Sequence, residues 1–288
     1  MRYRRYGRTG LEISVLTFGA MRIPFNESKA TPDERRKGEE NAVATMKRAM
    51  EAGINHVDTA RGYGNSERLV GLGLKELGRD KFYVSTKIGV KGTADEARQR
   101  IDEALKKMGT DYLDIVDLHG INTLAGLKEC TAKGGSIDGI KKAISDGVVG
   151  HVAFSSHAGP DVIVPALETG MFEAVSMLYW WTHQRNVVSA AKAADLDAGV
   201  LILSSSEKGG LLFRPTPKLE AVCRPFTPLV LAHRWLMAQK GGITLTVGAA
   251  KPGELEAHLP AGEGPDELTA DEKAALKKWS DAERSALG

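Results

Sequence analysis

The sequence predicts a closed (β/α)8 barrel, and three observations lead to this fold class. Short apolar runs rich in Val, Ile and Leu alternate with amphipathic helical segments along the chain. The runs are apolar at successive positions, which is typical of parallel strands that are buried on both faces. Eight such strand-helix units follow one another in 288 residues, and barrels of this class have about 250 residues before insertions.

The units can be placed in order along the chain. A short hairpin that turns near Gly7 and Gly10 is expected to close the barrel floor before the first barrel strand. The eight strands are expected at about 15–20, 54–58, 82–87, 112–119, 151–156, 174–178, 200–204 and 243–248. Helices are expected at 39–52, 66–78, a long segment ending near Met108 and Gly109, 137–147, 159–169, 185–198 and 226–239. Residues 268–285 are expected to form an exposed helical tail.

The remaining segments are predicted to be loops within one domain that spans residues 1–288. Glycine-rich GGSIDG at 134–139 and proline-bearing RPTPKLEAVCRPFTP at 214–228 are typical loop sequences. The strongly charged segment 26–37 is expected to be a solvated loop, with a lid as the alternative. An open doubly wound sheet is the rival fold, but no glycine-rich phosphate loop follows an early strand.

Composition and charge argue against several classes of partner. The chain has 39 Lys and Arg residues and 37 Asp and Glu residues, which gives a net charge of +2. This charge lacks the strong basic excess that is typical of nucleic-acid-binding proteins. No run approaches the roughly 18 apolar residues of a membrane span, and Glu12 and Ser14 interrupt the stretch where a secretory signal would lie. Cys130 and Cys223 lie far apart and outside metal-ligand spacing. We therefore expect a cytoplasmic protein without a metal site, a membrane partner or a nucleic-acid partner, while the oligomeric state stays open.

Four polar side chains stand where predicted strands end, which is where barrel active sites form. INHVD ends on Asp58, FYVSTK ends on Lys87, and YLDIVDLH ends on His119. Tyr63 lies in the loop ARGYGNSE that follows the second strand. Because these strands are consecutive, we expect the four side chains to converge on one side of the barrel mouth.

Together these side chains can transfer a proton. A tyrosine with a pKa of about 10 is a poor acid at neutral pH, but a nearby ammonium such as Lys87 favours the phenolate. A buried lysine needs a carboxylate partner, which Asp58 supplies. His119 can orient a substrate oxygen or assist the transfer. Each residue alone also has a structural interpretation as a cap, a rim side chain or loop packing, so the prediction depends on the combination.

The segments INHVDTARGYGNSERLVG, FYVSTK, YLDIVDLHG and GVVGHVAFSSH resemble the aldo-keto reductases, with matching spacing from about residue 2 to 260. The resemblance implies that Tyr63 protonates a carbonyl oxygen, Lys87 lowers the pKa of Tyr63, Asp58 holds Lys87, and His119 orients the carbonyl. It implies an oxidoreductase that transfers a hydride between a nicotinamide cofactor and a carbonyl or alcohol substrate. NADP(H) is the first expectation for the cofactor, and NAD(H) is the alternative.

The resemblance also implies a set of cofactor contacts. They are Ala20, Met21, Asp58, Ser155, Ser156, Ser176, Ser204, Ser205, Ala249, Lys251, Glu254 and His258. The chain departs from the family pattern at five of them. Ser176 replaces the usual glutamine, and Ser204 replaces an aromatic residue that stacks on the nicotinamide. After the last strand, Ala249 replaces a serine, Glu254 an arginine and His258 an asparagine. In addition, Ser206 replaces a common proline.

These departures have two interpretations. Drift within a working reductase is one. The other is a preference for NAD, because the carboxylate of Glu254 would repel a 2′-phosphate, although Lys251 could compensate. Two further classes stay open: a redox-neutral epimerase or lyase that retains its nicotinamide, and a non-catalytic binding protein. Retention of all four proposed catalytic residues argues against the second of these.

Aromatic side chains are expected around the substrate. By resemblance the segment containing Tyr179 lies beside the nicotinamide, and the predicted pocket residues are Phe25, Tyr179, Trp180 and Trp181. Trp180 replaces a frequent asparagine, so the pocket would be flat and apolar and would suit a sugar face or an aromatic carbonyl. Packing of the barrel rim is the alternative role for these side chains.

Overall fold

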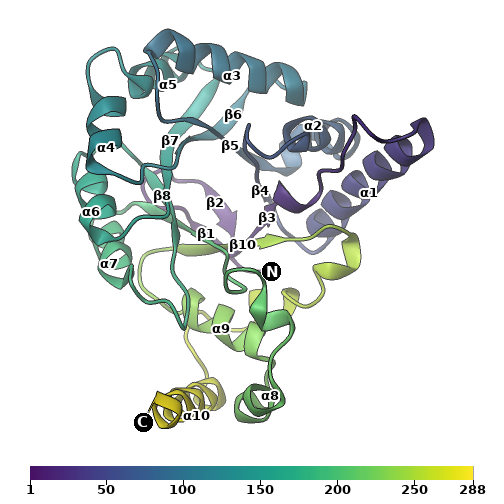
Figure 1. The fold of residues 1–288 in the computed structure, drawn as a ribbon, viewed down its shortest axis with the longest axis vertical. Helices are drawn as coiled ribbons and strands as arrows, with labels where there is room; N and C mark the ends of the chain where they lie inside the picture. The colour runs from purple at the N-terminus through teal and green to yellow at the C-terminus, as the bar shows by residue number, and fades with distance from the viewer. Residues whose placement is uncertain (288) are drawn as a thin grey trace.

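The computed structural model describes residues 1–287, and its centre is a closed barrel of eight parallel strands (Figure 1). The strands are β3 (Leu16–Gly19), β4 (His56–Asp58), β5 (Tyr83–Gly89), β6 (Leu113–His119), β7 (Val149–Ser156), β8 (Ala174–Leu178), β9 (Gly199–Leu203) and β10 (Ile243–Gly248). They follow one another around the barrel in chain order, and β10 closes it by pairing with β3. The predicted fold class is confirmed.

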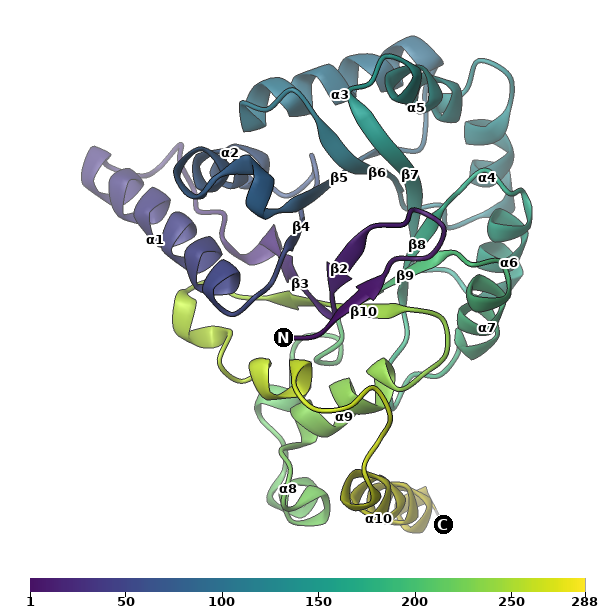
Figure 2. The same ribbon diagram turned by 180° about the vertical axis from the view of Figure 1, so that it is seen from behind.

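A hairpin of β1 (Tyr3–Arg5) and β2 (Glu12–Ser14) lies across the floor of the barrel, which is the end where the parallel strands begin, as Figure 2 shows. Tyr6 is buried there with Ile13 and Ile115 in a separate apolar cluster. Gly7 has a φ of 54°, and a Cβ at this position would lie 2.2 Å from the amide nitrogen of Gly199, so the turn requires glycine. The predicted floor hairpin is therefore confirmed.

Helices surround the strands and return the chain from the mouth to the floor (Figure 1). The α-helices are α1 (Pro32–Glu51), α2 (Ser66–Leu77), α3 (Ala94–Met108), α4 (Leu124–Thr131), α5 (Ser136–Ser145), α6 (Pro160–Glu168), α7 (Val187–Asp195), α8 (Pro217–Cys223), α9 (Pro228–Met237) and α10 (Ala270–Leu287). Short 3-10 turns are η1 (Ala20–Arg22), η2 (Arg79–Lys81), η3 (Leu211–Phe213), η4 (Pro252–Glu254) and η5 (Leu259–Gly262).

Three helices begin inside segments that we predicted to be loops. α1 begins at Pro32, within the charged segment 26–37, because Thr31 and Glu34 form a capping box that offsets the unpaired amides of the first turn. α8 lies within 214–228 for a similar reason, since the Thr216 side chain accepts a hydrogen bond from the backbone amide of Leu219. α5 begins within 134–139, and α4 was not predicted.

The predicted C-terminal helix is confirmed as α10, but one of its faces is docked on the protein, so the prediction that it is exposed was wrong for that face. Ala275, Leu276 and Trp279 are buried in a second apolar cluster with residues of α8 and α9. Arg234 of α9 donates a hydrogen bond to the carboxylate of Glu272 at 2.7 Å, and both side chains are buried. Figure 1 shows α8 and α10 side by side outside the ring of helices, where they contact each other. The three apolar positions form one stripe of the helix, and that stripe faces the protein.

The docking of α10 can be tested with a matched pair of substitutions. Leu276→Ala is expected to lower the free energy of unfolding by about 2–3 kcal/mol, because it removes a buried side chain and leaves a cavity. Its neighbour Lys277 is 76% exposed, and Lys277→Ala should change the stability by less than about 0.5 kcal/mol. Urea unfolding curves of both variants measure the difference. Equal stabilities would mean that α10 is not packed on α8 and α9.

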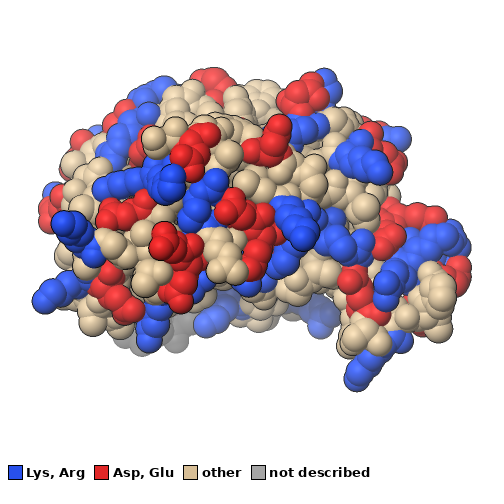
Figure 3. Space-filling model, turned by 90° about the horizontal axis from the view of Figure 1, so that it is seen from above, with Lys and Arg blue, Asp and Glu red and all other residues tan. Residues whose placement is uncertain are grey.

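The face formed by α3 and α5 carries charges of both signs. Figure 3 looks onto this face from the top of Figure 1, and basic and acidic side chains are interspersed over it. Some form pairs one helical turn apart, as Arg98 does with Asp102 and Lys142 with Asp146. Within residues 1–287, no helix has both the length and the apolar character that crossing a bilayer would require.

Candidate active site

A buried ion pair stands at the mouth ends of β4 and β5. Lys87 Nζ pairs with the carboxylate of Asp58 and donates a second hydrogen bond to the carbonyl oxygen of Thr59 at 3.0 Å. Lys87 is only 1% exposed. Burial acts to lower its pKa, but the carboxylates of Asp58 and Asp117 outweigh that effect, and the pKa lies above its ordinary value. Lys87 is therefore a charged ammonium in the barrel.

Tyr63 and His119 complete the group of four. Lys87 Nζ lies 5.4 Å from the centroid of the Tyr63 ring, and the His119 ring meets that ring edge-on, with 5.8 Å between the centroids. The structure thus brings Asp58, Tyr63, Lys87 and His119 together on one side of the mouth, because β4, β5 and β6 are neighbours.

Electrostatics at Tyr63 differ from the expectation in one respect. Burial raises the pKa of the phenol, while the charge of Lys87 acts to lower it. The net direction is upward, because burial, together with the negative charges of Asp58 and Asp117, outweighs the effect of the ammonium. Burial and the nearby Lys87 lower the pKa of His119. At neutral pH the site therefore holds a protonated phenol and a neutral imidazole.

A chain of hydrogen bonds inside the barrel holds Asp58 from below, and the sequence reasoning missed it. Ser85 Oγ donates to Asp58 Oδ1 at 3.1 Å and contacts His56 Nε2 at 3.1 Å. His56 Nδ1 lies 2.9 Å from Thr17 Oγ1. Burial lowers the pKa of His56 to about 4, so this imidazole is neutral. The available signal was spacing: residues two positions apart on a strand face the same side, so His56 lies below Asp58 and Ser85 below Lys87.

Asp117 is a second carboxylate in the barrel that the sequence reasoning missed. It lies two residues before His119 on β6 and is 2% exposed. Ser176 Oγ donates to Asp117 Oδ2 at 3.0 Å. Burial raises the pKa of Asp117 to about 6, while Lys87 acts in the opposite direction. Ser176, which we predicted as a cofactor contact, is thus engaged with Asp117.

A cleft of about 550 Å³ opens beside the barrel mouth. Its lining residues are Arg22, Gly209, Gly210, Leu211, Phe213, Arg214, Gly248, Gly253, Glu254 and Ala257. Gly248 ends β10, so the cleft starts at the strand that closes the barrel. The carboxylate of Glu254 accepts a hydrogen bond from the amide of Ala250 at 2.9 Å and pairs with Arg22 at 3.3 Å. Glu254 is therefore held in place inside the cleft.

A sequence model of the Aldo/keto reductase family matches residues 15–206, which is more than half of the chain. The chain belongs to the aldo/keto reductase family. It is 38% identical over 127 residues to L-galactose dehydrogenase of Arabidopsis thaliana, covering 41% of this chain and 38% of that protein. It is 35% identical over 133 residues to the NAD/NADP-dependent indole-3-acetaldehyde reductase of Schizosaccharomyces pombe, covering 45% of each chain. The matched segments span less than half of these relatives.

The fold of this aldo-keto reductase is also that of solved structures. The holo form of an aldo-keto reductase from Bacillus halodurans superposes with a TM-score of 0.79 at 23% identity, covering 96% of both chains. The structural similarity covers more of the chain than the segment that the family model matches.

Several predicted cofactor residues of this aldo-keto reductase already have protein partners. Ser155 Oγ accepts a hydrogen bond from the amide of Gly120 at 3.1 Å. Ser156 Oγ donates to the Ile121 carbonyl at 2.6 Å, and Ser205 Oγ donates to the Thr246 carbonyl at 3.0 Å. Each of these hydroxyls retains capacity for at least one further hydrogen bond.

The other predicted cofactor residues follow β3, β9 and β10, and apart from Glu254 they are not among the residues that line the cleft. Ala20 is buried and Met21 is exposed on η1. Ser204 has a φ of 56°, in a turn that ends β9. His258 is buried, stacked on His233 with 5.2 Å between ring centroids. The remaining two, Ala249 and Lys251, follow β10 on either side of Ala250.

The predicted pocket aromatics separate into two groups. Tyr179 and Trp180 are buried directly after β8. The Phe25 ring lies against Gly38 of α1. Trp181 packs between two helices of the outer cluster, with ring-centroid distances of 5.3 Å to Trp235 of α9 and 5.4 Å to Trp279 of α10. Tyr179 also contacts Trp235, with 5.3 Å between the ring centroids, so Phe25, Tyr179 and Trp181 all contact helices.

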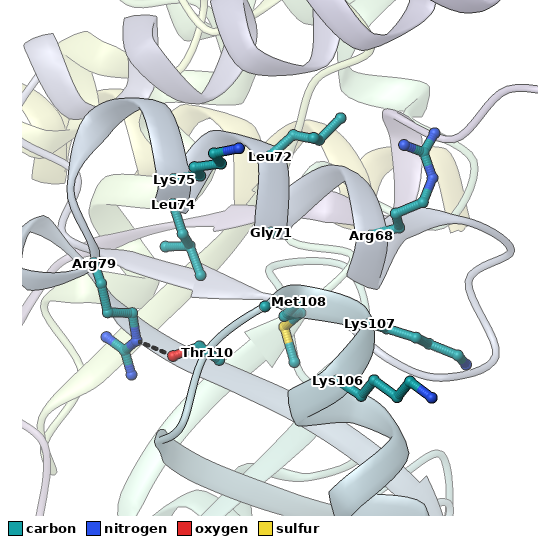
Figure 4. A pocket seen from close by; sticks show the side chains of 11 residues that line it. Arg68, Gly71, Leu72, Leu74, Lys75, Arg79, Lys106, Lys107, Met108 and Thr110 are labelled. Carbon is teal, nitrogen blue, oxygen red and sulfur yellow. Dashed lines mark hydrogen bonds between the residues drawn. The ribbon is translucent and has the colours of Figure 1, made fainter.

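A smaller cavity of about 310 Å³ lies between α2 and α3, and Figure 4 shows the basic side chains around it. Three of these side chains form ion pairs. Lys107 pairs with Glu67 at 3.3 Å, Arg68 with Glu39 at 2.9 Å, and Arg79 with Asp114 at 2.6 Å. Arg79 also donates to Thr110 Oγ1, the bond drawn in Figure 4. These ion pairs connect neighbouring elements of the outer layer. We assign no ligand to the cavity.

Proposed function

We propose that this chain is an NAD(P)(H)-dependent oxidoreductase that transfers a hydride between a nicotinamide cofactor and a carbonyl or alcohol substrate. The observation that carries the proposal is the position of Tyr63 beside the buried Lys87–Asp58 pair, with His119 against its ring. Family membership supports it, and so do the relatives, one named a dehydrogenase and the other a reductase. No observation on the described residues favours the redox-neutral or non-catalytic alternatives.

In this proposal the four residues handle the proton of the reaction. During reduction Tyr63 donates its phenolic proton to the carbonyl oxygen, and the Lys87 ammonium stabilises the phenolate that forms. Asp58 keeps Lys87 charged and in position. His119, being neutral, donates an N–H to the same oxygen and orients the carbonyl. During oxidation Tyr63 accepts the proton of the alcohol. The hydride is the chemistry that a bound nicotinamide supplies.

The cleft beside the mouth fits a dinucleotide. Its volume of about 550 Å³ lies in the range of ligand sites. Glycines at four lining positions leave the backbone accessible, and the guanidinium groups of Arg22 and Arg214 can pair with a diphosphate. Ser155 and Ser156 would hold the nicotinamide end, and Lys251 would serve the adenosine end. NADP(H) remains the first expectation for the cofactor, and NAD(H) the alternative.

Cofactor titration tests the proposal directly. Intrinsic tryptophan fluorescence should change saturably with at least one of NADPH and NADH, because Trp180 lies directly after β8. Glu254→Gln removes a charge without changing the size of the side chain, and it should tighten NADPH by about fivefold, since one like-charge contact is worth about 1 kcal/mol. NADH binding should stay within about twofold, because only NADPH carries the 2′-phosphate. Flat titrations with both cofactors would contradict the proposed function.

We also propose a substrate class, a domain organisation and a cellular compartment for the protein. The buried Tyr179 and Trp180 after β8 favour a substrate with a flat apolar face, either sugar-like or aromatic.

Residues 1–288 would act as one barrel domain, and the docked α10 supports this. Cys130 and Cys223 are free and buried, as is common in proteins of a reducing compartment such as the cytoplasm. We propose no nucleic-acid or membrane partner.

A further inference from the structure

Asp117 occupies an unusual place in the barrel. It is the register partner of Lys87 across the β5–β6 ladder, and both side chains face the barrel interior. Its other register partner is Ala153 on β7, whose methyl group leaves room for a bond across that strand. The Asp117 carboxylate uses this room to accept the hydrogen bond from Ser176 on β8. Asp117 therefore lies beside Lys87 and one inward position below His119.

Four charged or titratable groups lie close enough to Asp117 to interact with its charge. They are Asp58 on β4, Lys87 on β5, Tyr63 in the loop after β4, and Tyr6 between β1 and β2. From β7 and β8 it is faced by Ala153 and Ser176, which carry no charge. The only cation in this group is Lys87, and its ion pair is with Asp58. The positive charge of Lys87 thus interacts with two buried carboxylates, Asp58 and Asp117, and with the phenol of Tyr63.

Stability does not account for a carboxylate at this position. A buried carboxylate without an ion-pair partner opposes folding when it is ionised, and Ser176 supplies only one hydrogen bond. Other positions that face the floor cluster are apolar, among them Ile115, Ala174 and Leu201. Burial raises the pKa of Asp117 to about 6, so its charge is present when the phenol titrates. Groups that oppose folding are retained most often where they contribute to function.

We propose that Asp117 is a positioning residue of the active site, whose negative charge offsets part of the effect of Lys87 and so keeps the proton on Tyr63. With Asp117 ionised, the site has a protonated phenol over a wider pH range and acts as an acid for reduction. With Asp117 neutral, Lys87 acts on Tyr63 without this opposition, and the phenolate that oxidation requires forms at lower pH. The catalytic consequence rests on the proposed function.

The phenol can be titrated without any catalysis. Ultraviolet difference absorbance reports the tyrosinates, and the Tyr63→Phe variant provides the reference that isolates Tyr63. Asp117→Asn should lower the titration midpoint of Tyr63 by about 0.5–1 pH unit. The alkaline limb of kcat/KM for carbonyl reduction should move in the same direction by a similar amount. A change in packing alone would lower kcat at every pH without moving the midpoint.

Ser176→Ala is the matched control, because it removes the hydrogen bond and keeps the charge. Asp117 is fully ionised where Tyr63 titrates, so this variant should leave the midpoint unchanged. Asp117→Ser, with a smaller neutral side chain, makes the same test if the asparagine variant does not fold. A midpoint in the neutral variants equal to that of the unmodified protein would overturn the role of Asp117. Absence of turnover in the unmodified protein would overturn the proposed function instead, while the phenol titration would still decide the role of Asp117.

Discussion

Tyr63→Phe is expected to lower kcat for carbonyl reduction by about 10²–10⁴-fold, which is the usual contribution of a positioned general acid. The variant keeps the ring that lies 5.4 Å from Lys87 Nζ and 5.8 Å from His119, and it loses only the hydroxyl. The cleft that we propose for the cofactor lies beside the mouth, and Tyr63 is not one of its lining residues. Steady-state kinetics should therefore show the loss in kcat, while fluorescence titration shows unchanged cofactor binding.

Tyr112→Phe provides the control for this experiment. Tyr112 lies at the floor end of β6 and is exposed, so loss of its hydroxyl should leave kcat within about twofold of the unmodified protein, as for most surface changes. If Tyr63→Phe retained most of the activity, the proton would have to come from His119 or from water. Comparison with His119→Asn, which keeps a side-chain donor, would then separate these two sources.

The candidate site was predictable because a barrel turns chain order into spatial order. Polar residues that end successive apolar runs in the sequence lie side by side at the mouth when the strands are neighbours. Asp58, Lys87 and His119 each end such a run, and β4, β5 and β6 are adjacent in the barrel. The loop residue Tyr63 follows from the same logic, since a loop after β4 can reach only the mouth.

Residues inside the barrel were harder to predict, because each stands within a run that looks like an ordinary strand. His56, Ser85 and Asp117 lie one inward position below Asp58, Lys87 and His119, respectively. Their spacing of two residues was the available signal. The pKa values of His56 and Asp117 depend mainly on burial. That burial is produced by Tyr6, which lies at the barrel floor, and by strands from distant parts of the chain, so it could not be read from the sequence near each residue.

Helix α10 shows a second limit of sequence reasoning. Its apolar stripe of Ala275, Leu276 and Trp279 is interrupted by charged residues, and its partners on α8 and α9 precede it by a long segment. Amphipathic spacing predicted the helix correctly but could not identify the surface that covers it. The packing of Trp181 could not be predicted for the same reason, because its partners Trp235 and Trp279 are distant in sequence.

Breaking the Lys87–Asp58 pair is expected to have the largest effect on stability. Lys87→Met leaves the Asp58 carboxylate buried without its cation, and Asp58→Leu removes the ion-pair partner of the ammonium, which keeps only the more distant charge of Asp117. Each change should lower the free energy of unfolding by about 3–5 kcal/mol. Replacing both residues removes both charges and should cost less than the sum of the single changes, because no unpaired charge is left. Guanidinium unfolding of the three variants measures this coupling.

The pH dependence of these variants distinguishes a lost charge from a lost contact. Burial is the largest effect on the pKa of Lys87, and without Asp58 we expect it to exceed the remaining effect of Asp117. The pKa of Lys87 would then lie below its value in the unfolded chain, so the unfolded state would bind more protons. The stability of Asp58→Leu should therefore rise as the pH approaches 10, which the double variant should not show. Lys81→Met, at an exposed pair with Asp80, should cost at most about 1 kcal/mol at any pH. Equal losses in the single and double variants would mean that side-chain packing, and not charge, holds the mouth of the barrel together.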